Sequence, residues 1–444
     1  MSEPFSLADI ITGVVWSSLI LVVVTLVSRR SSGRSVILVG LAVKLVTSLA
    51  YNIYIVYIYG GGDTLLYHQE GIQYAGMLRA GLSGGLGLYL STCPFFTLAC
   101  SSTARLSNFT GLVHLLTFDS FTATTFVFAA LGFWGQYLLY KTFVLHYPTP
   151  GIRAWWRIGI LFFPTLTFWS AGILKDTLGI WGLGIALWGS YKLIQRSTMK
   201  NLFLTGLGLY IVLLFRIQIV PVLLIALAPY FLTGARSVGA SNRPSLRRIG
   251  AQPLFQLFVL LLSVATIWMV GRIQPSYSFA RLPVTLVTQS SVYETIEGVT
   301  TRPIITDPSW HSLVRAAPRA VFVALYRPLI GEGNGPAGLL AGVENTLLLL
   351  FSLRAVVLLV KYPSALPRAW RSPLFLTCLV FVLVFGIAVA ASTPNLGTIS
   401  RYRIPLIPFL IGILTIFEAQ FLELRKRRLH GAEASLHSHS APSA

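Results

Sequence analysis

The sequence predicts an all-α protein of the polytopic membrane class, with about 11 transmembrane helices (about ten to twelve) in one domain over residues 1–428. Of its 444 residues, 55% are hydrophobic and only 11% are charged, and the mean hydropathy is +0.73. The apolar content is higher, and the charged content lower, than in ordinary soluble domains. The apolar residues form continuous runs rather than alternating with polar ones, which favours membrane helices over the strands of a membrane barrel.

The charge balance indicates which partners to expect. The chain has 34 Lys and Arg residues against 14 Asp and Glu residues, a net charge of +20. In a soluble protein this excess would suggest nucleic acid, but in a membrane protein the expected partners are anionic lipid headgroups and phosphates, not nucleic acid. The N-terminal stretch MSEPFSLAD is acidic rather than basic, so we expect the first span to remain in place instead of acting as a cleaved signal peptide.

Apolar runs and their flanks predict where each span begins. The candidate starts lie near residues 7, 36, 119, 158, 177, 201, 217, 253, 338, 373 and 404. When the N-terminus is placed outside, 21 of the 34 Lys and Arg residues fall in loops on one side. The positive-inside rule identifies that side as the cytoplasm.

Three segments do not fit simple spans. Residues from about 60 to 118 are moderately apolar and interrupted by glycines and Pro94, which predicts interfacial or re-entrant helices on the external side. A long external loop is predicted over about 272–335, with an amphipathic patch near residues 311–325. The tail, 429–444, has low complexity and is predicted to be disordered in the cytoplasm.

The three cysteines have two interpretations. Cys93 and Cys100 lie in one segment and are able to pair if it faces an oxidising compartment, whereas buried free cysteines are also common. Cys378 lies inside an apolar run. No Cys and His spacing resembles a zinc site.

The stretch GGGDTLLYHQEG, residues 60–71, holds the densest group of titratable side chains: Asp63, Tyr67, His68 and Glu70. In a helix, Asp63, Tyr67 and Glu70 share one face. This pattern suits a general base with supporting groups, or a divalent metal (Mg²⁺ or Mn²⁺) held by Asp63 and Glu70. The alternative is that Asp63 only caps a surface helix.

Two further charged sites interrupt apolar runs. Lys175 and Asp176 lie between two short apolar segments, an arrangement that commonly lines a substrate cavity. Lys175 would then bind a phosphate that Asp176 orients, although Asp176 would equally cap an ordinary hairpin. Arg216 is flanked by apolar residues, so a lipid phosphate is a natural partner, and extension toward the headgroups is the alternative.

The segment SRYRIPLIPFL places Arg401, Tyr402 and Arg403 at the predicted external end of the last span. Because arginines there oppose the positive-inside trend, they require an anion, and a forked guanidinium suits phosphate or diphosphate. Candidates of lower rank lie in the long external loop: His311, Arg319, Arg327 and Glu332.

Taken together, GGDTLLYH, FPTLTFWSAGILKD and RYRIPLIPFL resemble the integral-membrane glycosyltransferases of the GT-C class, such as dolichyl-phosphate-mannose-dependent mannosyltransferases and aminoarabinose transferases. The resemblance implies transfer of a hexosyl or pentosyl group from a polyprenyl-phosphate-linked donor to a glycan, lipid or protein acceptor. It implies an active face on the external (periplasmic) side of a bacterial inner membrane.

By position, the resemblance makes Asp63 the base or metal ligand. It makes Lys175, Arg216, Arg401 and Arg403 the groups that bind the polyprenyl phosphate. The chain departs from the class pattern in two ways: the carboxylate follows the second predicted span rather than the first, and no DxD pair is present.

Two other functions are compatible with the sequence. A polysaccharide polymerase or O-antigen ligase also uses lipid-linked sugars, and the long loop would supply its catalytic Arg and His from Arg302, His311, Arg315, Arg319 and Arg327. A transporter or flippase of lipid-linked substrates needs polar groups near the membrane midplane, where Lys44 is the candidate.

Overall fold

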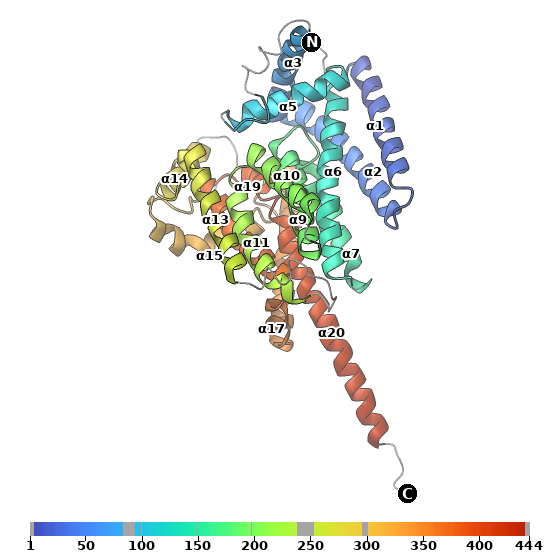
Figure 1. Ribbon diagram of the computed structural model, residues 1–444, viewed down its shortest axis with the longest axis vertical. Coiled ribbons are helices and arrows are strands. Elements are labelled where there is room, and N and C mark those ends of the chain that lie inside the picture. The colour runs from blue at the N-terminus through green and yellow to red at the C-terminus, as the bar shows by residue number, and fades with distance from the viewer. Residues whose placement is uncertain are drawn as a thin grey trace.

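The computed structural model describes residues 4–82, 94–98, 100–148, 150–196, 198–237, 253–294 and 301–439, and every regular element within these ranges is helical. The predicted all-α class is therefore confirmed for this part of the chain. Figure 1 shows that α3 and α5 lie toward one end of the long axis, and the C-terminal part of α20 extends beyond the other end.

The α-helices follow one another in chain order as α1 (Leu7–Val27), α2 (Arg34–Ile53), α3 (Asp63–Leu82), α5 (Ser102–Thr117), α6 (Phe121–His146), α7 (Arg153–Trp156), α8 (Pro164–Trp169), α9 (Lys175–Gln195), α10 (Met199–Phe215), α11 (Ile219–Ser237), α13 (Pro253–Ile273), α14 (Leu282–Glu294), α15 (Trp310–Tyr326), α16 (Gly335–Lys361), α17 (Ala365–Trp370), α18 (Pro373–Ser392), α19 (Leu396–Tyr402) and α20 (Ile407–His439). Two short π-helical segments, η1 (Tyr54–Tyr59) and η3 (Arg157–Leu161), and two 3₁₀ turns, η2 (Pro150–Ile152) and η4 (Pro275–Tyr277), complete the list.

Several helices are long and apolar enough to cross a membrane. Within the described residues these are α1, α2 continued through η1, α16, α18 and the first part of α20, five in all. A sixth is formed if α5 and α6, which bend by 114° relative to each other, are one broken span. These helices support a membrane-embedded protein, while the total of about 11 spans stays a prediction.

The predicted span starts agree with the helix starts to within about three residues, with one exception. The run near residue 158 is divided into α7, η3 and α8, and Pro164 is the first residue of α8. Proline lacks the N–H that a continuing helix needs, so this run cannot form one straight span. The predicted interfacial helices correspond to α3 and α5, and the amphipathic patch to α15.

The C-terminal tail differs from its prediction. α20 continues to His439, which covers most of the segment 429–444 that was expected to be disordered. Its sequence ELRKRRLHGAEASLH is rich in Leu, Ala, Glu, Lys and Arg, which favour helix. Low complexity alone was therefore a poor indicator here.

Helix α9 lies at the centre of the bundle, between α6 and α10 (Figure 1). Glycines allow this close approach: a Cβ at Gly135 of α6 would clash with the backbone of Ile180, and one at Gly208 of α10 would clash with Ala186. Small residues at helix contacts let backbones approach closely in membranes. α9 is consequently fixed along its length, and so are the charged residues at its two ends.

Lys44 of α2 forms hydrogen bonds that hold the segment just before α9 in place. Its buried ammonium donates to Gln136 Oε1 (2.9 Å), the Thr167 carbonyl (2.9 Å) and Ser170 Oγ (2.7 Å). All three acceptors belong to the protein, so this intramembrane charge serves to hold the break between α8 and α9 against α2 and α6.

Candidate functional site

Arg401 joins two carboxylates from distant parts of the chain. Its Nη1 lies 2.9 Å from Asp63 Oδ2, and its Nε lies 2.8 Å from Asp176 Oδ2. Asp63 is the first residue of α3, Asp176 is in the first turn of α9, and Arg401 is near the end of α19. The fold thus brings together three segments that the sequence analysis had singled out separately.

Arg216 completes the arrangement from the end of α10. Its Nη2 donates to Asp176 Oδ1, so each oxygen of this buried carboxylate binds a different arginine. The Arg216 guanidinium also lies over the Tyr402 ring, 4.8 Å from its centroid. We refer to Asp63, Asp176, Arg216, Arg401 and Tyr402 as the arginine–aspartate cluster.

The two carboxylates of the cluster have different environments. The Asp176 side chain is 2% exposed, whereas that of Asp63 is 50% exposed and makes an ion pair with Arg401. Both oxygens of the buried Asp176 carboxylate are occupied by guanidinium groups, so its role is to hold the two arginines in place. Asp63 is free to exchange its partner because water and other molecules have access to it.

Lys175 lies beside the cluster and adds a further cation. Its Nζ donates to Thr103 Oγ1 of α5 (2.8 Å) and lies 5.7 Å from the centroid of the buried Tyr67 ring. Arg216, Arg401 and Lys175 together carry three positive charges against the two negative charges of Asp63 and Asp176. This local excess of one positive charge favours binding of an anion.

Two residues near the cluster were not predicted from the sequence. Thr103 binds Lys175, and the hydroxyl of Tyr293 in α14 lies 2.7 Å from that of Tyr402. Thr103 belongs to a polar interruption, SSTAR, whose role no spacing indicates. Tyr293 is one tyrosine in a long loop segment, and only the folded chain brings it to Tyr402.

The structure places His68 away from the cluster. Its Nδ1 lies 3.1 Å from His114 Nε2, and His114 Nδ1 lies 3.0 Å from Thr124 Oγ1. Burial lowers the pKa of His68 to about 4, so the ring is neutral at physiological pH. His68 therefore packs α3 against α5 and α6 and does not assist Asp63 directly.

Glu70 also has a separate partner. Its carboxylate accepts a hydrogen bond of 2.5 Å from Ser107 Oγ in α5, whereas Asp63 binds Arg401. In the described residues, no group of three or more His, Cys, Asp or Glu side chains is placed to hold a metal ion. Asp63 and Glu70 therefore do not share a site in this geometry.

Arg403 does not join the other predicted phosphate-binding residues. It is fully buried, donates from Nη1 to the Leu325 carbonyl (2.8 Å), and binds Asn345 Oδ1 through Nη2. Side chains two positions apart in a helical segment point in different directions, so Arg401 and Arg403 cannot face the same ligand. Arg403 instead connects α15 and α16.

The candidates in the long loop also lie elsewhere. His311 is exposed on α15, and Arg319 donates to the carbonyls of Arg302 (2.9 Å) and Pro303 (3.3 Å). Arg327 pairs with Glu332 at 2.8 Å, and its hydrogen bond holds the pKa of Glu332 below the ordinary value. These contacts stabilise the loop itself.

The cysteines divide into two kinds. Cys378 is free and buried in α18, whereas Cys100 is disulfide-bonded. Cys93, the partner in one of the two interpretations of the sequence, lies outside the described residues.

Comparisons of this chain with protein-family models, with curated proteins and with solved structures find no match.

Proposed function

We propose that the chain is an integral-membrane glycosyltransferase that moves a hexosyl or pentosyl group from a polyprenyl-phosphate-linked donor to an acceptor hydroxyl on a glycan, lipid or protein. The observation that carries the proposal is that Arg401 binds both Asp63 and Asp176. A half-exposed carboxylate beside fixed guanidinium groups supplies the two functions that such a transfer needs, a general base and a charged site for the leaving phosphate.

The proposed topology has about 11 spans in a GT-C-like arrangement, with α3 and α5 as interfacial helices on the external face of a bacterial inner membrane. One support is the disulfide at Cys100, because disulfides persist in oxidising compartments. Thr103, three residues further along, binds Lys175. The cluster and the disulfide therefore belong to the same side of the protein.

The donor phosphate would enter between Lys175 and Arg401. The Arg401 side chain is 18% exposed, so a phosphate approaching from the Asp63 side competes with Asp63 for its Nη atoms. A phosphate that takes this position would release the Asp63 carboxylate. Asp176 would remain in place and keep Arg216 and Arg401 correctly oriented.

The transfer is then a single displacement. The acceptor hydroxyl oxygen attacks the anomeric carbon of the donor sugar, and its proton passes to the released Asp63 carboxylate. The bond between the anomeric carbon and the phosphate oxygen breaks, and that oxygen retains the electron pair. The negative charge that develops on the departing polyprenyl phosphate is stabilised by Arg401 and Lys175. The configuration at the anomeric carbon is inverted.

The test uses the full chain in vesicles that contain polyprenyl-phosphate hexoses and pentoses, with release of polyprenyl phosphate as the readout. Asp63→Asn removes the base and is expected to lower the rate by about 10²- to 10⁴-fold. Arg401→Ala removes a phosphate-binding group and is expected to weaken donor binding as well. Asp119→Asn is the matched control, because Asp119 pairs with Arg79 at a partly exposed position outside the cluster.

Full transfer by Asp63→Asn would exclude Asp63 as the base. The alternative of a polymerase or ligase makes a different prediction: His311→Ala and Arg315→Ala would abolish activity while Asp63→Asn would retain it.

A further inference from the structure

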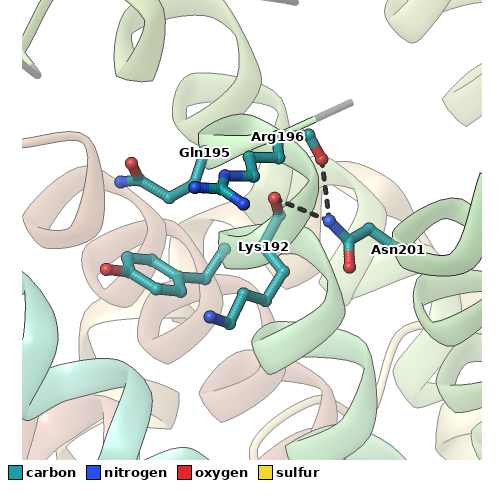
Figure 2. A pocket seen from close by; sticks show the side chains of 5 residues that line it. Lys192, Gln195, Arg196 and Asn201 are labelled. Atoms are coloured by element: carbon teal, nitrogen blue, oxygen red, sulfur yellow. Dashed lines mark hydrogen bonds between the residues drawn. The ribbon is translucent and has the colours of Figure 1, made fainter. Parts of the chain in front are cut away.

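A second polar site lies at the opposite end of α9 from the cluster. There, a cavity with a volume of about 400 Å³ opens between the last turn of α9 and the start of α10 (Figure 2). This volume falls within the range of small-molecule sites. The cavity is lined by Tyr191, Lys192, Gln195, Arg196 and Asn201.

Asn201 holds the wall of this cavity in shape. Its Nδ2 donates to the carbonyls of Lys192 (3.1 Å) and Arg196 (2.7 Å), as the dashed lines in Figure 2 show. These carbonyls belong to the end of α9, where backbone acceptors run out of helical donors; the Lys192 carbonyl also accepts from the Arg196 N–H (2.8 Å). The basic side chains are thus presented from a backbone that is already fixed.

In the described part of the chain, the cations around the cavity lack acidic partners. Among the residues that the structure describes, no carboxylate lies within ion-pair distance of Lys192 or Arg196. The Lys192 and Lys141 ammonium groups lie 4.8 Å and 4.9 Å from the centroid of the same Trp188 ring. An anion in the cavity would offset the repulsion between these like charges.

Apolar side chains beside the cavity indicate what kind of anion binds there. The first turns of α10 expose Met199 (79%), Leu202 (51%) and Phe203 (69%), which suits contact with acyl chains. α9 has 21 residues, a length of about 30 Å that matches the hydrocarbon thickness of a bilayer. α9 is one of the spans predicted from the sequence, so with the cluster at one membrane interface we place the cavity at the other.

We infer that this cavity binds the phosphate of an anionic phospholipid headgroup, with the acyl chains along α10, on the face opposite the arginine–aspartate cluster. Lys192 and Arg196 would contact the phosphate as charged donors. Gln195 and Tyr191 would contact the remainder of the headgroup. The site is distinct from that proposed for the sugar donor, and it does not depend on sugar transfer.

The experiment measures lipid retention by the purified full chain in nanodiscs of phosphatidylcholine with a minor fraction of phosphatidylglycerol, using native mass spectrometry. Wild type is expected to retain phosphatidylglycerol selectively. Lys192→Gln with Arg196→Gln is expected to weaken retention by about tenfold for each cation removed, because hydrogen bonds to charged groups are worth at least that much. Lys192→Arg keeps the charge and is expected to retain the lipid.

The matched control is Arg425→Gln with Lys426→Gln, which removes the same charge from exposed positions of α20. An equal loss in this control would reduce the effect to general surface charge and overturn the inference. Displacement of the lipid by excess inorganic phosphate would assign the cavity to a soluble phosphate instead. If the double variant unfolds, wild-type protein that retains phosphatidylcholine and phosphatidylglycerol equally would also refute the proposal.

Discussion

Cations gather at both ends of α9, but their partners differ. At its first turn, Asp176 binds Arg216 and Arg401, so these charges are held by the protein itself. At its last turn, Lys192 and Arg196 have no carboxylate partner among the described residues. Paired charges fix geometry and unpaired charges attract a ligand. The first end is therefore suited to catalysis and the second to retention of an anionic lipid.

Asp176→Asn is expected to have the largest effect on the first-turn end of α9, where the charges are paired, and to lower the stability of the fold. It leaves two arginines without their shared buried anion, and removing one partner of a buried ion pair typically costs about 3–5 kcal/mol. Thermal unfolding in detergent would measure the loss. Glu423→Gln is the control: it breaks the exposed pair with Arg427, which is expected to cost at most about 1 kcal/mol. Equal losses in both variants would contradict a special role for Asp176.

Arg401→Lys tests whether the arginine–aspartate cluster needs a guanidinium group, which binds two carboxylates at once, or only a positive charge. An ammonium group is a point charge and cannot bind Asp63 and Asp176 in the same fixed geometry as a guanidinium. We expect polyprenyl phosphate release to fall by about 10²- to 10³-fold, as for loss of a preorganised donor. Arg427→Lys, at an exposed ion pair, is the control for stability. Transfer at the wild-type rate would show that charge alone suffices.

The sequence predicted the helices better than it predicted the contacts between them. Apolar runs mark where helices begin, and breaks such as Lys175–Asp176 mark where charges reach the ends of spans. The meeting of Asp63 with Arg401 was anticipated because both were assigned to one face of the membrane. The orientation of each side chain was not, since a shift of one or two residues rotates it to another face.

Arg403 and Glu70 show this limit most clearly. Arg403 lies two positions from Arg401, and its guanidinium binds Leu325 and Asn345 instead of the cluster. Glu70 turns to Ser107 because α5 packs against α3. The cavity at Lys192 was also not predicted from the sequence, because it depends on the hydrogen bonds from the Asn201 side chain to the Lys192 and Arg196 carbonyls.

Tyr293→Phe is expected to have a smaller effect on the paired end. It removes one hydrogen bond to Tyr402 and leaves the ion pairs intact. A single hydrogen bond contributes about 0.5–1.5 kcal/mol, so release of polyprenyl phosphate should fall by about two- to tenfold. Tyr59→Phe, at an exposed ring, should leave the rate unchanged. A loss as large as that of Arg401→Lys would instead place Tyr293 among the groups that contact the substrate.

Glu332→Gln is expected to have the smallest effect on the free energy of unfolding, and it gives the baseline for the other variants. The Arg327–Glu332 pair is partly exposed, with each side chain at 29%, so the variant should lose at most about 1 kcal/mol at neutral pH. Because the hydrogen bond from Arg327 lowers the folded-state pKa of Glu332 below its ordinary 4.5, the contribution is present above that pH and disappears as the pH falls through the folded-state pKa. Unfolding curves of wild type and variant should therefore differ slightly at neutral pH and converge in acid. A difference that persists in acid would mean that the Glu332 side chain stabilises the loop by packing and not by charge. The pair would then no longer measure what a partly exposed ion pair contributes to the stability of this protein.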